Sequence, residues 1–341
     1  MNSKAATKRT PRDLAMRALR VLLLLLALAF CAYSLVSQWD ETVRAFEEMS
    51  WPTLAGALAA GLAALFAHML GWRAFLTGLG SPLPIKAAFR IQSISQLGKY
   101  VPGKVWALVT QVELARTYHV PRIRSFSATL LAVATSSACG LAMAAATLPL
   151  TSDEARDRYW WLFLLAPVMV ASLHPRIVTW CLDTALRLVR RPPLEHPVSL
   201  SATLRAVGWT VLGWVLFGVH TWLLCMAVGG DGPGLPFLAT GAFTLAFVAG
   251  FLVFIAPGGI GAREAVLLVV LNPVLPAGTA IVVAIGSRVV LTVADLLNAG
   301  AATLIGRSTP RPESDESDGT DGNEPGGQEL VPGTEPTKER S

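Results

Sequence analysis

Long apolar runs separated by short polar stretches dominate this chain. A membrane-spanning helix needs about 20 predominantly apolar residues, because the hydrocarbon core of a bilayer is about 30 Å thick. Runs that approach or exceed this length predict membrane spans at residues 18–37, 54–76, 126–150, 159–173, 207–228, 237–256 and 277–305. The pattern therefore predicts an all-α, polytopic integral membrane bundle of about seven or eight transmembrane helices, with one or two re-entrant or broken elements.

Residues 89–111 interrupt the apolar pattern. This segment, FRIQSISQLGKYVPGKVWALVTQ, carries charged and amide side chains, and Pro102-Gly103 breaks it in the middle. Each half has about ten residues, which as a helix would reach about 15 Å, or half of the hydrocarbon core. Broken backbone at membrane depth is tolerated where it is buried in protein or lines a wet cavity. The segment is therefore predicted to form a re-entrant helical hairpin that lines a pathway or a binding site.

A second break follows at residues 257–264, PGGIGARE. Its glycines permit a tight turn, and Arg263 and Glu264 then begin a short apolar helix. Two topologies stay open for residues 262–275. If they cross the membrane, the total is eight spans and both termini are cytosolic; if they re-enter, the C-terminal tail lies outside. Two broken elements, one in each half, resemble the discontinuous helices that surround midplane sites in transporters.

The composition fits a membrane protein, with 53% hydrophobic and only 15% charged residues, against about 25% charged residues in soluble domains. The net charge of +5 combines a basic start with an acidic end. We expect a basic cytosolic N-terminal segment at 1–17, a transmembrane domain at 18–306 and a disordered acidic tail at 307–341. Arginines of the 176–205 loop favour the cytosolic side, and residues 177–189 are compatible with an amphipathic helix on the membrane.

Several kinds of chemistry lack the residues they need. The four cysteines make no CxxC pair and the five histidines show no metal-ligand spacing, so we expect neither disulfides nor a metal site. His68 and His220 lie in apolar spans, as hydrogen-bonded structural residues or as cavity residues. With no P-loop, dinucleotide fingerprint or nucleophile–base set, we expect no cofactor, no nucleic acid and no enzymatic activity. An intramembrane enzyme that uses Glu264 or Asp295 as a base is the weaker alternative.

The first candidate site is the centre of the predicted hairpin. Lys99 and Lys104 flank a Pro-Gly turn, and the free amides at a helix start attract anions. Two ammonium groups at this turn could hold a lipid phosphate. The alternative is a solvated surface loop whose lysines merely follow the positive-inside rule. The predicted headgroup-binding residues of this turn are Gln96, Lys99, Tyr100, Pro102, Gly103 and Lys104.

The second candidate site is the glycine-rich break. Here Arg263 could form a two-pronged contact with a phosphate, while the charge of Glu264 favours a helix N-terminus. The alternative is a plain helix break with an Arg–Glu pair. The predicted headgroup-binding residues of this break are Gly258, Gly259, Gly261, Arg263 and Glu264.

Arg288 and Asp295 place two charges inside the last predicted span. An ionisable residue at mid-membrane costs roughly 2.5–3.5 kcal/mol on insertion scales, so each should have a partner. The two residues are two helical turns apart, about 10 Å along the axis, which is too far for a simple direct pair. Arg288 could meet a headgroup or Glu264, and Asp295 could meet a basic residue of the first hairpin or serve in proton coupling. A purely structural network between helices is the alternative.

QLGKYVPGKVW at residues 96–106, followed by APGGIGAREA at residues 256–265, resembles the lysylphosphatidylglycerol synthase transmembrane family, also called flippase-like proteins. The resemblance extends over about residues 15–306. Among its relatives, the multiple peptide resistance factors join such a region to a cytosolic aminoacyl-phosphatidylglycerol synthase domain, and the membrane region is implicated in flipping the product lipid. The short acidic tail of this chain cannot hold an acyltransferase fold, so synthase activity is not expected to come with the resemblance.

The resemblance implies a multi-pass protein of the bacterial cytoplasmic membrane that handles an anionic or aminoacylated phospholipid, or a polyprenyl-linked lipid. The first functional hypothesis is a lipid flippase or translocator in which Lys99, Lys104 and Arg263 coordinate the headgroup phosphate. The second is a non-transporting membrane partner or scaffold of a separately encoded lipid-modifying enzyme or glycosyltransferase. Movement of lipid by the purified protein alone would discriminate between them.

Overall fold

The computed structural model of the protein describes residues 50–100, 105–153, 156–157, 160–172, 184, 199–252 and 261–307. Within these residues all regular structure is helical, which confirms the predicted all-α class. The first predicted span, the N-terminal segment, nearly all of the helix considered at 177–189, and the tail beyond Arg307 lie outside the described residues.

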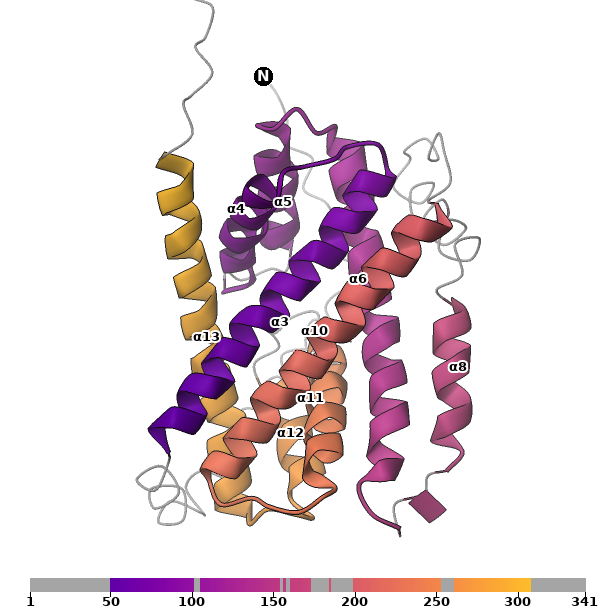
Figure 1. Ribbon diagram of the computed structural model, residues 1–341, viewed down its shortest axis with the longest axis vertical. Helices are drawn as coiled ribbons and strands as arrows, with labels where there is room; N and C mark the ends of the chain where they lie inside the picture. Colours follow the sequence, from indigo (N-terminus) through magenta and orange to yellow (C-terminus); the bar gives the residue numbers. More distant parts are fainter. Residues whose placement is uncertain are drawn as a thin grey trace, which may run out of the picture.

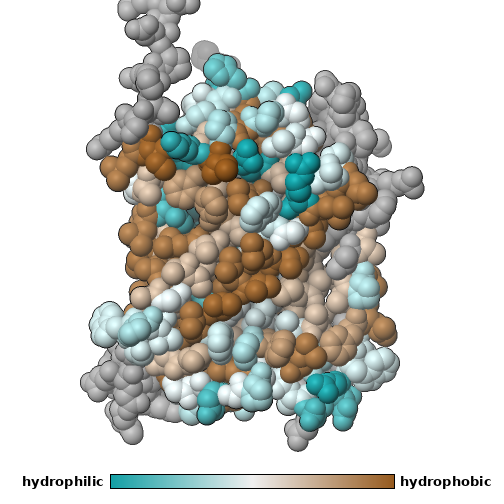
Figure 2. All heavy atoms as spheres, viewed as in Figure 1, coloured by the Kyte–Doolittle hydropathy of each residue, from teal (hydrophilic) through white to brown (hydrophobic). Residues whose placement is uncertain are grey.

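The described helices follow one another closely along the chain. In order they are α3 (Trp51–Gly78), α4 (Ile85–Gln96), the 3₁₀ helix η1 (Leu97–Tyr100), α5 (Val105–Arg116), α6 (Arg122–Thr147), the 3₁₀ helix η2 (Leu148–Leu150), α8 (Leu162–Ser172), α10 (Leu200–Ala227), α11 (Leu235–Leu252), α12 (Ala262–Leu271) and α13 (Ala277–Arg307). Among them, α3, α6 with η2, α10 and α13 are long and apolar enough to cross a membrane. Figure 2 shows hydrophobic side chains around the middle of the molecule and hydrophilic ones towards both ends, as a membrane bundle requires.

Close contact between α3 and α10 forms the centre of the bundle, where the two helices lie side by side (Figure 1). Small residues make this contact possible. A Cβ atom at Gly213 of α10 would lie 2.5 Å from Cδ2 of His68, and one at Gly71 of α3 would lie 3.0 Å from Oγ1 of Thr210. Such glycines let two backbones approach closely, which is how helices gain packing contacts in lipid, where no hydrophobic effect drives them together.

Two hydrophobic clusters show which helix ends lie together. The upper cluster, at the top of Figure 1, joins the end of α3 to the starts of α4, α6 and α10 and to the end of α5, through residues that include Trp72, Phe75, Ala88, Ile91, Ala115, Ala128 and Ala206. The lower cluster joins the start of α3 to the end of α10, the start of α11, the end of α12 and the start of α13, through residues that include Ala57, Leu224, Leu235, Leu271 and Ile281. Because α3 has 28 residues, it runs about 42 Å between these two ends.

The helices α4 and α5 form the predicted re-entrant hairpin. Each has 12 residues, so each reaches only about 18 Å, and both open ends lie in the upper cluster. Gln111 Nε2 donates a hydrogen bond to Gln92 Oε1 over 2.8 Å, which ties the two helices together. At the tip, a Cβ atom at Gly98 would lie 2.6 Å from the backbone nitrogen of Ala107, so only glycine lets η1 turn this tightly.

A second hairpin enters from the opposite end of the bundle. The helix α12 has only 10 residues, or about 15 Å, and it packs against α11. The start of α11 and the end of α12 both lie in the lower cluster. The helix α13 then runs from the lower cluster to the upper end (Figure 1). The end of α13 therefore lies at the same end of the bundle as the open end of the first hairpin, although α12 spans only half of the bundle. Neither topology considered for residues 262–275 contained this combination.

Candidate functional site

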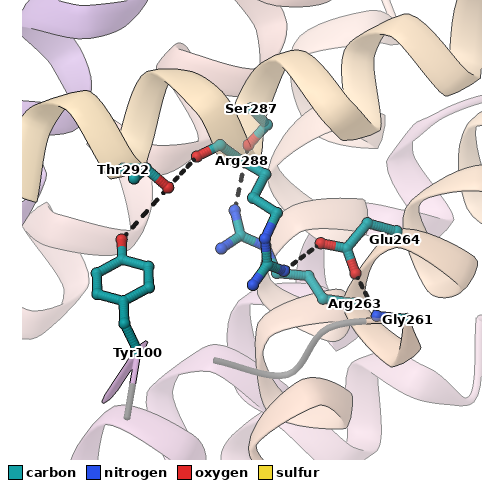
Figure 3. Close-up of polar contacts among 7 residues, drawn as sticks. All are labelled: Tyr100, Gly261, Arg263, Glu264, Ser287, Arg288 and Thr292. Carbon is teal, nitrogen blue, oxygen red and sulfur yellow. Dashed lines mark hydrogen bonds and ion pairs between the residues drawn. The ribbon is translucent and has the colours of Figure 1, made fainter. Parts of the chain in front are cut away.

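The tip of the first hairpin meets α13 at Asp295. Nζ of Lys99 lies 2.6 Å from Oδ2 of Asp295, and the Tyr100 hydroxyl donates a hydrogen bond to the same oxygen over 2.6 Å. The Tyr100 hydroxyl also lies 3.3 Å from Oγ1 of Thr292 (Figure 3). The Asp295 side chain is only 3% exposed. A carboxylate buried this deeply requires such partners, and it fixes the hairpin tip on α13.

The tip of the second hairpin meets α13 about two turns away, at Arg288. Gly261, with φ of 87°, turns the chain into α12, and its N–H donates to Oε2 of Glu264 over 2.7 Å. The other oxygen of Glu264 accepts from Arg288 over 2.5 Å (Figure 3). A positive φ is readily adopted only by glycine, which explains why a glycine stands at position 261. Both oxygens of Glu264 are therefore occupied by protein donors.

Arg263 is the cation of this tip that lacks a carboxylate partner among the described residues. Its guanidinium lies over the ring of Phe243 of α11, 4.6 Å from the ring centre, and donates to Oγ of Ser287 over 3.1 Å. The guanidinium of Arg288 is close enough to repel it (Figure 3). An aromatic face and a hydroxyl stabilise a cation without neutralising its charge.

A cavity of about 60 Å³ lies between the two hairpin tips and α13. Its polar lining comes from both tips and from α13, whereas α3, α10 and α11 supply apolar and aromatic side chains. The lining residues are Leu65, Lys99, Tyr100, Phe217, Phe243, Phe247, Arg263, Arg288, Leu291, Thr292 and Asp295. A single water needs about 10–15 Å³, so a cavity of this size holds a few waters.

A smaller cavity of about 40 Å³ shares a wall with the first one, because Leu65 and Asp295 line both. Its other polar residues carry amide, hydroxyl or imidazole groups. They are His68, Gln92, Ser93, Gln96 and Asn298. Asp295 thus stands between a cationic cavity and one lined by neutral polar groups.

The formal charges around the two tips do not cancel. Lys99, Arg263 and Arg288 give three positive charges, whereas Glu264 and Asp295 give two negative ones, so the described residues leave one net positive charge. The two ion pairs account for Lys99 and Arg288, and the excess charge therefore belongs to Arg263. An uncompensated charge inside a membrane bundle is costly and marks a place where an anion would be stabilised.

The chain matches the family described as the lysylphosphatidylglycerol synthase TM region over residues 17–297. The chain belongs to this family. No match is found among curated proteins. Membership confirms the resemblance inferred from the two Pro-Gly motifs and indicates a membrane protein with a lipid-related function.

In this member of the synthase TM-region family, residues predicted from separate motifs converge on one site. Lys99, Tyr100, Arg263, Arg288 and Asp295 line the larger cavity. Three others lie beside it: Gln96 lines the smaller cavity, Glu264 holds Arg288 in place, and Gly261 turns the chain into α12 and donates to Glu264. The remaining predicted residues lie outside the described residues; they are Pro102, Gly103, Lys104, Gly258 and Gly259.

Sequence reasoning missed the residues that reach the site from neighbouring helices. Ser287 contacts Arg263, Phe243 stacks against it, and Thr292 contacts Tyr100. A serine or phenylalanine inside an apolar run carries no signal of its own. Arg288 and Asp295 were the sequence hints of a polar face on α13, and Ser287 lies directly before the first of them.

Proposed function

We propose that this protein is a lipid translocator whose headgroup site is the cavity between the two hairpin tips. The observation that carries the proposal is Arg263, a guanidinium on the cavity wall with no carboxylate partner among the described residues. A guanidinium presents several N–H donors in one plane and suits the oxygens of a phosphate. The phosphate of a phospholipid or of a lipid-linked headgroup would supply the missing negative charge.

The arrangement of the hairpins supports transport rather than simple binding. One hairpin opens at the upper cluster and the other at the lower cluster, and their tips meet at α13. Discontinuous helices that meet at a midplane site are a recurring design of transporters. The cavity of about 60 Å³ is too small for a whole headgroup. Entry therefore requires the tips to separate, and the Lys99–Asp295 pair is the contact that would open.

The charges at the two ends support an orientation in the membrane. Described basic residues near the upper cluster include Arg73, Arg116, Arg122, Arg124 and Arg205. The lower end carries Asp153, Asp157 and Asp231 with Arg156. Cytosolic loops are enriched in arginine and lysine, so we infer that the upper end faces the cytosol of a bacterium and that the first hairpin opens there.

A non-enzymatic role is also part of the proposal. Both oxygens of Glu264 accept hydrogen bonds from protein groups, and Oδ2 of Asp295 is held by Lys99 and Tyr100. A general base needs a free carboxylate oxygen within reach of a substrate proton. Glu264 therefore has no free oxygen, and Asp295 holds Lys99 and Tyr100, which favours a binding and transport site over a catalytic one.

A scrambling assay tests the proposal. Purified protein in vesicles of phosphatidylcholine, with a trace of fluorescent phosphatidylglycerol, is expected to expose inner-leaflet lipid to dithionite faster than empty vesicles do. We predict that Arg263→Ala slows this movement about tenfold or more, because hydrogen bonds to a charged group contribute about 1.5–3 kcal/mol. Arg263→Lys should retain part of the activity, since it keeps the charge but not the planar donor fork.

The control variant is Arg116→Ala, which removes an exposed arginine at the end of α5. It should leave the rate unchanged. Wild-type rates in a folded Arg263→Ala variant would overturn the headgroup site. No lipid movement by folded wild-type protein with any labelled headgroup would overturn the translocator and support the second reading, a membrane partner of a separate lipid-modifying enzyme.

A further inference from the structure

Arg263 is held from behind by a chain of hydrogen bonds that crosses four helices. Its guanidinium donates to Oγ of Ser287 over 3.1 Å. Ser287 lies 3.0 Å from Nε2 of His220, and Nδ1 of the same ring lies 2.9 Å from the carbonyl oxygen of Ala57. The chain therefore connects α12 to α13, α10 and α3, and Figure 3 shows its first bond, between Arg263 and Ser287.

The chemistry of the groups fixes the direction of every bond in this chain. A carbonyl oxygen only accepts, so Nδ1 of His220 carries the proton and donates to Ala57. In a neutral ring Nε2 is then an acceptor, and the Ser287 hydroxyl donates to it. The lone pairs of Ser287 remain for Arg263. A protonated ring would leave the Ser287 proton without an acceptor among the described residues, so the neutral ring satisfies the whole chain.

Neither His220 nor Ser287 lines the cavity, and the side chains of both are fully buried. A ligand in the cavity would therefore meet Arg263 and not the residues behind it. Phe243 restrains the guanidinium plane from one side, and Ser287 occupies one of its N–H groups. Among the described residues no further acceptor binds this guanidinium, so its remaining donors face a ligand in a fixed orientation. A site preorganised in this way avoids ordering a flexible side chain on binding.

We propose that His220 and Ser287 are positioning residues that orient Arg263 towards the headgroup phosphate. This inference rests on the proposed headgroup site and adds to it the residues that set its geometry. They form no contact with the lipid and act only through the guanidinium. Their effect should therefore exist when Arg263 is present and vanish when it is absent.

A double-mutant cycle tests this dependence. The probe is dioctanoyl-phosphatidylglycerol, titrated onto the full-length protein in detergent, with dioctanoyl-phosphatidylcholine alongside. We predict that Ser287→Ala weakens binding of the anionic probe about tenfold in the wild-type background, as expected for loss of a hydrogen bond to a charged group. In the Arg263→Ala background the same change should have almost no effect. A residue that only stabilises the fold would instead lower both affinities equally.

Three further variants complete the experiment. Ser287→Thr keeps the hydroxyl and should bind like the wild type, and His220→Gln keeps an acceptor for Ser287 and should bind better than His220→Ala. Thr221→Ala removes a buried hydroxyl that bonds only within α10, so it is the matched control and should not change affinity. Equal losses with Ser287→Ala in both backgrounds would overturn the positioning role. Wild-type affinity of Arg263→Ala itself would instead overturn the headgroup site, which keeps the two failures distinct.

Discussion

Asp295 is the residue at which the first hairpin, α13 and both cavities meet. It binds Lys99 and Tyr100 and forms part of the wall between a cationic and a neutral polar space. Its neighbour across the cavity, Arg263, has the opposite situation, with a charge and no carboxylate among the described residues. At the scale of residues the site therefore combines a carboxylate that has partners with a guanidinium that has no carboxylate partner among the described residues. Under the proposed function, this asymmetry would favour an anionic ligand.

Variants of the Lys99–Asp295 ion pair test how much the pairing of Asp295 contributes to the free energy of unfolding. Asp295→Leu should lower the free energy of unfolding by on the order of 2 kcal/mol, because it strands the Lys99 ammonium; breaking buried pairs costs about 3–5 kcal/mol, and Lys99 is partly exposed. Adding Lys99→Met should recover much of this loss, since an apolar pair leaves no unpaired charge. Unfolding in increasing dodecyl sulfate, followed by circular dichroism, measures both. A double variant less stable than Asp295→Leu would contradict this account.

At the scale of elements, glycines decide how closely α3 and α10 approach. Gly213 lies against His68, so a side chain there has no room, whereas Gly208 on the same helix has no atom within 4 Å of the Cβ it would carry. The position of His220, and with it the chain behind Arg263, depends on this helix pair. The close contact between α3 and α10 therefore sets both the helix packing and the position of the side chains behind Arg263.

These two glycines form a matched pair of variants. Gly213→Ala should destabilise the protein by about 1–3 kcal/mol, the usual cost of inserting an extra methyl into a packed interior. Gly208→Ala should be neutral or slightly stabilising, because its methyl meets open space. The same dodecyl sulfate titration separates them. Equal stability of the two variants would show that α3 and α10 can separate without cost at Gly213.

At the scale of the whole molecule, the two hairpins open at opposite ends and α13 connects their tips. The α5–α6 turn carries Thr117 at the upper end, and the α10–α11 turn carries Asp231 at the lower end; both are exposed. The proposed orientation places Thr117 in the cytosol and Asp231 outside. Arg307, at the end of α13, should then share the side of Thr117.

Labelling from one side of the membrane tests this arrangement. In a background without the four natural cysteines, Thr117→Cys and Asp231→Cys should react with an impermeant maleimide from opposite faces. An impermeant reagent added to intact spheroplasts should modify Asp231→Cys, and Thr117→Cys only after the membrane is opened. Modification of both from the outside would contradict the arrangement of the hairpins.

Much of this architecture could be predicted from the sequence. The helix pairing and side-chain contacts that could not be predicted depend on tertiary packing. The break at Pro102-Gly103 and the polar residues around it predicted the first hairpin, because neither suits an uninterrupted span. The pairing of α11 with α12 was not predicted, since apolar residues on all sides of a helix say nothing about its direction. His220 was singled out as a hydrogen-bonded or cavity histidine, and the structure shows it hydrogen-bonded. Ser287, its partner, was not predicted, because their contact forms only where four helices meet and local periodicity carries no information about that meeting.

The polar positions of α13 have one further consequence. Arg288, Thr292, Asp295 and Asn298 follow one another at spacings of four, three and three residues, so they form a single stripe that faces both cavities. Neighbouring positions are about 4.5–6 Å apart along the axis. A headgroup that travels along α13 would exchange hydrogen-bond partners one helical turn at a time, and it would keep at least one partner throughout. Its passage would then be divided into several small barriers instead of one large desolvation step.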